Sequence, residues 1–111
     1  MSTNKKLKKK LKLDLEEILS ATEMRELKDQ SQLLKPTVVI EGTELTAIAI
    51  NEVERALSGQ ELIKIRIASE DSELRAKMVQ DICHKTHSVL IQIIGHMVVI
   101  YRKTPEETDE E

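Results

Sequence analysis

The sequence predicts a two-layer α/β sandwich of the α+β kind, with one four-stranded mixed sheet and helices on one face, in the order αβαβαββ plus a basic N-terminal helix. Two observations predict this class. Aliphatic residues recur at helical spacing in some segments and alternate or form short runs in others. The 111 residues have room for one domain, and 12 Ile, 13 Leu and 7 Val against one Tyr and no Phe or Trp require an aliphatic core.

Residues 1–19 are predicted to form a basic amphipathic extension ending near Leu19. Their apolar residues recur at spacings of four, four and three, which is the helical period. These residues are Leu7, Leu11, Leu15 and Ile18. Residues 20–104 are expected to form the folded domain, and 105–111 an acidic disordered tail.

The folded domain is predicted to open with a helix behind a capping box. The Ser20 hydroxyl can accept a hydrogen bond from the new helix, while Glu23 reaches back to the cap amide. Pro36 is expected to stop this helix, because the residue before a proline avoids helical angles. The side chains that it should bury are Met24, Leu27, Ser31 and Leu34.

A short buried strand at 37–40 and a turn at 41–44 are predicted to precede a second helix of the domain. Thr46 can cap its start, and Ser58-Gly59 is expected to cap its end. Its buried stripe should comprise Ala49, Ile50, Val53, Ala56 and Leu57.

Apolar and charged residues alternate in the segment 62–68, which predicts a strand with one buried face and one solvent-exposed face. Ile63, Ile65 and Ile67 share the covered face. Lys64 and Arg66 share the other face, which should be open or only partly covered.

The last helix should follow the polar residues 69–72, which offer N-cap candidates. Its predicted buried stripe is Leu74, Met78, Val79 and Ile82. Two final strands, 89–94 and 97–101, are predicted to join in a tight hairpin at Gly95-His96.

Charge is distributed unevenly along the chain, whose net charge is −3. Residues 1–12 carry six lysines and no acid, whereas 106–111 carry five acids and no base. A polyanion would be attracted to the first segment and repelled by the second, unless both are merely solvating ends. The aliphatic stretches are too short to span a bilayer, and the single Cys83 fits a reducing, cytoplasmic setting.

Neither a metal site nor an enzyme is predicted. Cys83 and His87 lie four residues apart, with His84 and His96 as further candidates, but structural zinc normally needs four well-spaced ligands. Cys83 is therefore expected to be a small buried hydrophobe. The sequence contains no serine-hydrolase or nucleotide-binding motif, so no catalytic residue and no cofactor are expected.

A set of basic residues in the domain could form a phosphate-binding surface, or could be solvated charges among glutamates. The set comprises Lys28, Lys35, Lys64, Arg66 and Arg102. Binding that stacks RNA bases on surface aromatics is nearly excluded, because Tyr101 is the one aromatic residue besides the histidines.

Several motifs resemble those of one family. The stretch 61–71, ELIKIRIASED, resembles the E-L-I-K-V-K-I-A-x-E-D signature of YhbY-like proteins, the CRM (chloroplast RNA-splicing and ribosome-maturation) family. Leu34-Lys35-Pro36, Leu45-Thr46, the helix end 54–57 and the pair Ile94-Gly95 before 98–102 also fit, in the right order. The resemblance runs from about Ser20 to Lys103.

This resemblance implies a non-enzymatic RNA-binding module with a fold similar to the C-terminal domain of translation initiation factor 3. Single-domain bacterial members are associated with precursors of the large ribosomal subunit. The family's G-x-x-G loop resembles the phosphate clamp of KH domains, but here it reads Glu41-Gly42-Thr43-Glu44. His87 also replaces an expected glycine. We hypothesise that the lysine-rich N-terminus compensates for a weakened clamp, the alternative being binding through a different surface.

The predicted function is therefore binding of ribosomal RNA in large-subunit precursors, by a cytoplasmic protein that is expected to be a monomer and to bind no membrane. An alternative is a protein-interaction adaptor that docks through its N-terminal helix, and a weaker one places that helix on an anionic membrane. The predicted RNA-binding residues are Lys5, Lys6, Lys8, Lys9, Lys10, Lys28, Lys35, Gly42, Thr43, Lys64, Arg66 and Arg102.

Overall fold

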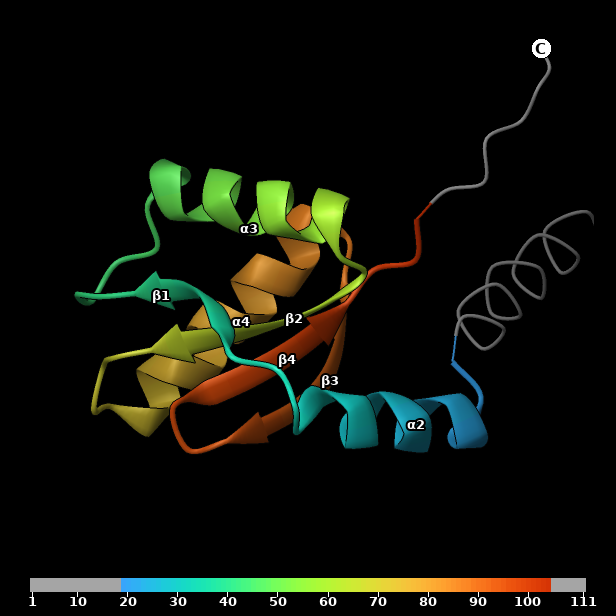
Figure 1. Cartoon of the computed structure of the whole chain (residues 1–111). Coiled ribbons are helices and arrows are strands. Elements are labelled where there is room, and N and C mark those ends of the chain that lie inside the picture. The colour runs from blue at the N-terminus through green and yellow to red at the C-terminus, as the bar shows by residue number, and fades with distance from the viewer. Residues whose placement is uncertain (1–18, 105–111) are drawn as a thin grey trace, which may run out of the picture.

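The structure, a computed structural model, describes residues 19–104. The predicted basic N-terminal helix and acidic tail lie outside these residues. The elements, labelled as in Figure 1, are α2 (Ala21–Ser31), β1 (Pro36–Ile40), α3 (Ala47–Gly59), β2 (Leu62–Ile67), α4 (Ser72–Thr86), β3 (Val89–Ile94) and β4 (Met97–Tyr101). This order confirms the predicted αβαβαββ arrangement.

The four strands form one mixed sheet in the order β1-β2-β4-β3. β1 and β2 run parallel, while β2 with β4 and β4 with β3 run antiparallel. The turn between β3 and β4 contains Gly95 with a φ of 59°, a left-handed conformation that glycine adopts without steric cost. The hairpin predicted at Gly95-His96 is thereby confirmed.

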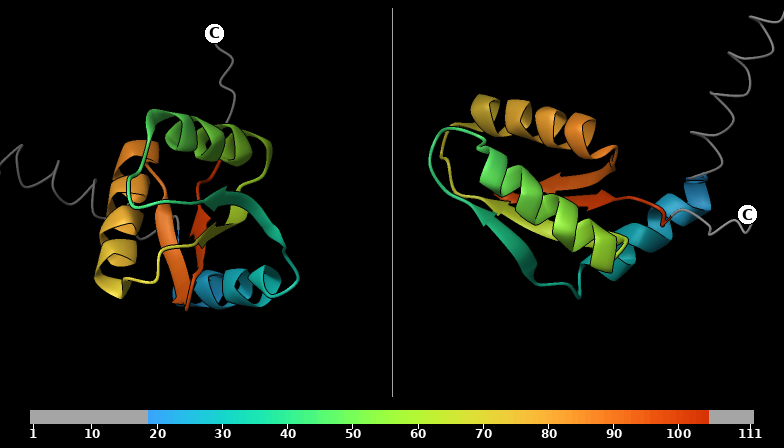
Figure 2. Two further views of the ribbon diagram at one scale, coloured as in Figure 1. Left: turned by 90° about the vertical axis from the view of Figure 1, so that its left-hand side faces the viewer. Right: turned by 90° about the horizontal axis from the view of Figure 1, so that it is seen from above.

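The hydrophobic core lies between the sheet and the pair α3 and α4, and it is aliphatic as predicted. Ile63, Ile65 and Ile67 are fully buried on this face of the sheet. From the helices, Val53 of α3 and Ile82 of α4 are fully buried against them. Figure 2 shows α3 and α4 together on one side of the sheet and α2 apart from them.

Helix α2 packs against β2 and β3 on the opposite face, where Ser31 lies beside Lys64. Helices thus lie on both faces of the sheet and not on one face as predicted; the second face is partly covered, which the alternation of β2 also allowed. Ser31 is buried at the contact, whereas Met24, Leu27 and Leu34 are only half-buried. One end of this face stays open beyond the end of α2.

The polar caps identified in the sequence form as predicted. Ser20 and Glu23 make both hydrogen bonds of the capping box, at 3.1 and 3.0 Å. The Thr46 hydroxyl accepts from the Ala49 amide, and a carboxylate oxygen of Asp71 accepts from the first amides of α4. His87 ends α4 with a φ of 55°, so it occupies the left-handed position that a glycine would occupy more easily.

Three further details of the prediction were wrong. Helix α2 ends at Ser31 rather than near Pro36, because the next amides form tight turns with carbonyls three residues back, which leaves Leu33 exposed. Gly59 is the last residue of α3 and not a left-handed cap, since Gln60 continues in an extended conformation. β1 is not buried throughout, because Val39 faces the open side of an edge strand.

Candidate nucleic-acid interface

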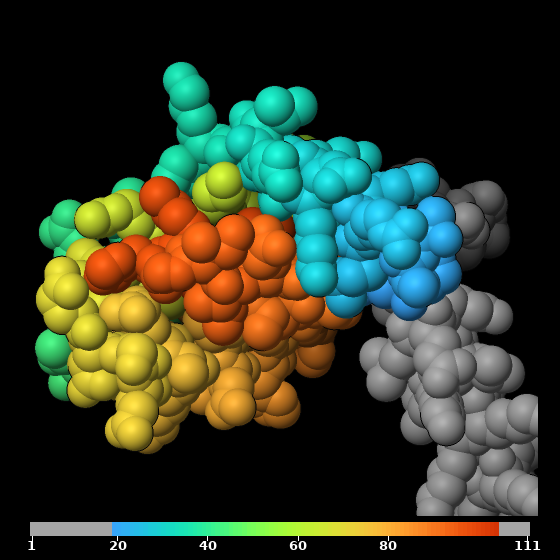
Figure 3. All heavy atoms as spheres, turned by 90° about the horizontal axis from the view of Figure 1, so that it is seen from below, coloured from blue at the N-terminus to red at the C-terminus, as the bar shows by residue number. Residues whose placement is uncertain are grey.

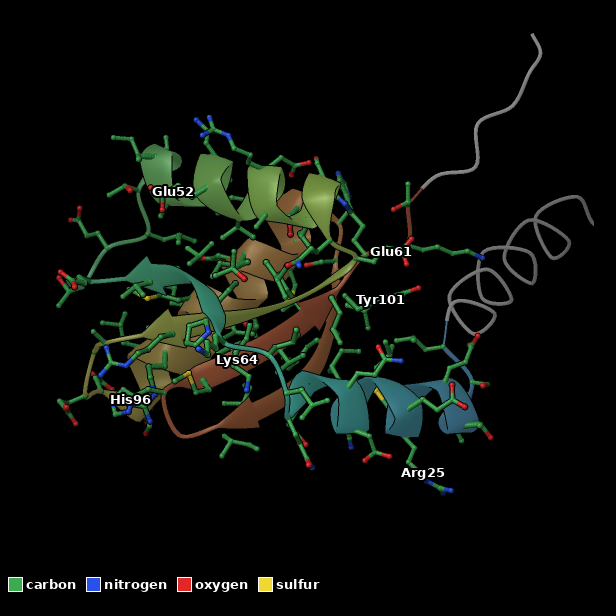
Figure 4. All side chains as sticks on the ribbon, viewed as in Figure 1. Arg25, Glu52, Glu61, Lys64, His96 and Tyr101 are labelled. Atoms are coloured by element: carbon green, nitrogen blue, oxygen red, sulfur yellow. The ribbon has the colours of Figure 1, made fainter. Side chains whose placement is uncertain are left out.

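The sheet face opposite α3 and α4 carries the predicted cations Lys64 and Arg66. Both side chains come from β2, where residues two apart point to the same side. Strand pairing sets Lys64 opposite Val99 and Arg66 opposite Met97 of β4, and Val39 of β1 flanks Arg66 on the other side. We call this surface the basic face; Figure 4 shows Lys64 in its middle.

The two cations of the basic face are not neutralised inside the fold. Neither Lys64 nor Arg66 forms an ion pair with any residue in the range 19–104. Lys64 is half-buried and Arg66 is exposed. Their charge is therefore directed at solvent, where it can attract an anion.

A groove of about 150 Å³ lies on the basic face where α2 ends. The buried Ser31 is small, and its hydroxyl donates to the Lys28 carbonyl at 2.7 Å, so the helix end approaches the sheet closely. The hairpin register places Gln92 opposite Val99 and Ile94 opposite Met97. The lining residues are Ser31, Gln32, Lys64, Gln92, Ile94, Met97 and Val99.

The groove opens on the face that Figure 3 shows, where α2 lies beside the side chains of the β3–β4 hairpin. Lys28 is exposed on the last turn of α2, and Lys35 is exposed in the segment that leads to β1. These two lysines therefore come from the chain around the end of α2, near the groove. The structure thus brings the α2 end and the β2 cations into one region.

The loop at the predicted clamp position lies at one end of the sheet. Its four residues, 41–44, are all exposed, and Gly42 has a φ of 89° that favours glycine. Because Ile40 pairs with Ile67, this loop leaves β1 at the same end of the sheet as Arg66. Glu41 and Glu44 repel a phosphate there, whereas Arg66 attracts it.

Arg102 lies apart from the basic face. Its guanidinium donates to a Glu54 carboxylate oxygen at 2.7 Å and to the Thr86 carbonyl at 2.9 Å. A longer contact of 3.5 Å reaches the Ser58 hydroxyl. Arg102 thereby ties the end of β4 to α3 and to the end of α4, on the helix-covered side, and it does not join Lys64 and Arg66.

The ionisable groups whose pKa is shifted do not line the groove of the basic face. The amide of Thr104 donates to Glu61 at 2.7 Å, and this hydrogen bond lowers the pKa of that carboxyl. Burial raises the pKa of Tyr101, and the carboxylates of Glu61 and Glu23 raise it further. Figure 4 shows Glu61 and Tyr101 at one end of the sheet and His96 at the other.

Cys83, His87 and His96 lie at separate places in the fold. Burial raises the pKa of the Cys83 thiol, and the side chain packs against the core. His96 lies 3.7 Å from Glu70, and His87 ends α4. Within residues 19–104, no group of three or more Cys, His, Asp or Glu side chains is arranged to hold a metal ion.

The sequence did not identify the residues that complete the groove. Gln32 lies in a turn that was predicted as helix, and Gln92 interrupts an apolar strand. The two-residue turn at Gly95-His96 does predict that Ile94 pairs with Met97. No sequence pattern indicated that β4 would lie next to β2, which is what brings that pair beside Lys64 and Arg66.

The sequence pattern of the CRS1 / YhbY (CRM) domain matches residues 19–102. This chain belongs to the CRM domain family. It is 33% identical over 88 residues to PA4753 of Pseudomonas aeruginosa, named a probable RNA-binding protein, covering 79% of this chain and 85% of the relative. A Haemophilus influenzae relative named an RNA-binding protein is 35% identical over 88 residues, which cover 79% of this chain and 89% of that one.

A solved structure agrees with the CRM fold. The solution structure of SAV1595 from Staphylococcus aureus aligns with a TM-score of 0.70 and 26% identity, over 84% of this chain and 97% of that one. The curated relatives are named for RNA binding and neither name describes an enzyme. None of the described helices is long and apolar enough to cross a bilayer. RNA binding is thus the function for which both of these relatives are named.

Proposed function

We propose that this CRM protein binds ribosomal RNA in precursors of the large ribosomal subunit, as a cytoplasmic monomer that assists their assembly. Family membership and the names of the relatives support an RNA partner. The observation that carries the proposal is the pair Lys64 and Arg66, side by side on the basic face with no acidic partner in the range 19–104. The choice of ribosomal RNA and of large-subunit precursors as the partners rests on the resemblance to single-domain CRM proteins.

The geometry of the basic face suits a nucleic-acid backbone. Two residues of one strand face that lie two apart are separated by about 7 Å, so Lys64 and Arg66 can contact neighbouring phosphates. Lys28 on the last turn of α2 and Lys35 after that helix add positive charge around its end. Because the loop 41–44 carries two carboxylates, the backbone is expected to cross β2 and not to lie on the loop.

The first experiment measures binding to ribosomal RNA as a function of salt. Each phosphate contact contributes roughly 0.7 to 0.9 to the slope of log affinity against log salt. The double variant Lys64→Gln and Arg66→Gln should therefore flatten the slope by about 1.5 and weaken binding. A matched control replaces Lys77 and Lys85, two exposed lysines of α4 on the other side of the sheet, with glutamine.

The control variant should keep most of the affinity, because its lysines are remote from the basic face. Equal losses in the two double variants would mean that only net charge matters, and the proposed site would be wrong. Deletion of residues 1–12 tests the compensation hypothesis in the same assay. An unchanged salt slope after that deletion would remove the six lysines from the mechanism.

The second experiment tests the particle. A cell lysate is separated on a density gradient with and without prior nuclease treatment. We expect the protein to sediment with large-subunit precursors and to leave that position after nuclease or after the Lys64 and Arg66 replacements. Sedimentation that resists nuclease would instead indicate a protein partner and would favour the adaptor alternative.

A further inference from the structure

We infer that the groove on the basic face binds a single unpaired RNA base, while Lys64 and Arg66 hold the adjoining phosphates. This inference rests on the proposed RNA binding and adds a base-binding subsite to it. The geometry points to a base because an apolar floor, amide side chains and a cation meet in one place. The floor is made by Met97 and Val99, and Ile94 lies at the rim.

The size of the groove fits one ring system. Its volume is about 150 Å³, and an apolar cavity of about that size accommodates a benzene-sized ring. The groove is open to solvent on one side, so a base can enter while its ribose and phosphate remain in solvent. A pyrimidine is expected to fit within it, and the larger purine rings are expected to project.

The chemistry of the lining matches the two surfaces of a base. The flat faces of a base are apolar and polarisable, and the thioether of Met97 makes favourable contacts with aromatic rings. The edge of a base carries donors and acceptors, and each amide of Gln32 and Gln92 offers both. The site therefore needs no aromatic side chain, which suits a chain with one tyrosine.

The charge around the groove argues for a nucleotide over an apolar peptide. Lys64 lines the groove itself, and Arg66 is two residues further along the same strand face. Ile94 remains 63% exposed at the rim, so an apolar surface lies beside two unneutralised cations. A base with its phosphate satisfies both, because it combines an apolar ring with a negative charge.

The test compares two isoleucines of the same strand. Ile94→Ala removes part of the groove wall, whereas Ile93→Ala removes the same atoms from the opposite side of the sheet. Both side chains are substantially exposed, so neither change should unfold the protein. The probes are a single-stranded oligouridylate of eight nucleotides and the matching ribose-phosphate chain without bases, at one salt concentration.

We expect the wild-type protein to bind the oligouridylate at least fivefold more tightly than the chain without bases. Ile94→Ala should abolish most of that preference, by about five- to tenfold, while Ile93→Ala keeps it. Equal affinity of the wild-type protein for the two probes would overturn the inference and leave the proposed function standing. Absence of binding to both probes and to ribosomal RNA would overturn the proposed function itself.

An independent readout locates the base. The methyl signal of Met97 in a carbon–proton correlation spectrum should shift on addition of the oligouridylate, because a ring placed against a methyl group changes its chemical shift. The chain without bases should leave the signal in place. Shifts of the Met97 methyl that are equal for the two probes would contradict a base in the groove.

Discussion

Replacement of Arg102 by methionine should destabilise the fold and leave RNA affinity unchanged. This arginine was predicted from the sequence to bind RNA. In the structure its guanidinium donates hydrogen bonds to a Glu54 carboxylate oxygen at 2.7 Å and to the Thr86 carbonyl at 2.9 Å. Methionine keeps most of the length and apolar bulk of the side chain. The change therefore removes the hydrogen bonds with little loss of packing.

The magnitude follows from the exposure of the two partners. The Arg102 and Glu54 side chains are 21% and 47% exposed, so their ion pair contributes no more than about 1 kcal/mol. The carbonyl of the fully buried Thr86 loses a charged donor, which costs about 1 to 2 kcal/mol. The free energy of unfolding should fall by about 2 kcal/mol, which for a domain of this size lowers Tm by about 10 °C.

The assay is urea unfolding at neutral pH, followed by circular dichroism, with RNA titration of the same samples. The matched control is Lys103→Met, which removes one exposed positive charge from the next position. The control should change the free energy of unfolding by less than about 0.5 kcal/mol. A stable Arg102→Met variant with weakened RNA binding would refute the assignment of Arg102 to the fold and return it to the binding surface.

Three further changes test other parts of the structure. His87→Gly should raise the free energy of unfolding by about 0.5 to 1 kcal/mol, because glycine adopts the φ of 55° without strain; a lower urea midpoint would contradict this. Glu61→Gln should lower stability at neutral pH. Because the pKa of Glu61 is depressed in the folded protein, the difference in free energy of unfolding between the variant and the wild-type protein should be constant above about pH 4.5. This difference should shrink as the pH falls through the lowered pKa, and a difference that grows on acidification would contradict the prediction. Burial raises the pKa of Cys83, so iodoacetamide at pH 8 should modify the folded protein far more slowly than the urea-unfolded protein; equal rates in mass spectra would show an accessible thiol.

Local patterns in the sequence predicted the elements well, because each depends on near neighbours. The isoleucine alternation at 63, 65 and 67, the capping box at Ser20 and the Gly95-His96 turn were all confirmed. The end of α2 was not predicted, since the contact of Ser31 with the sheet and the turns after it decide where the helix stops. Pro36 marks the start of β1 instead.

The candidate site was predicted only where it depends on one strand. Alternation within β2 was sufficient to place Lys64 and Arg66 on one face. The groove depends on the order of strands and on which face α2 covers, and neither follows from spacing along the chain. Arg102 shows the converse, because its partners Glu54 and Thr86 are distant in sequence and no local signal connects them to it.

The described chain enters and leaves the domain at the same end of the sheet. Leu19 lies beside Tyr101, and the Thr104 amide is bonded to Glu61, whereas His96 and the loop 41–44 lie at the opposite end. A tag or an added module joined directly to Leu19 or to Thr104 would thus attach at the end of the sheet where β2 begins, away from Arg66. Protein tethered at Leu19 or at Thr104 should consequently present the Arg66 end of its basic face to dissolved ligands.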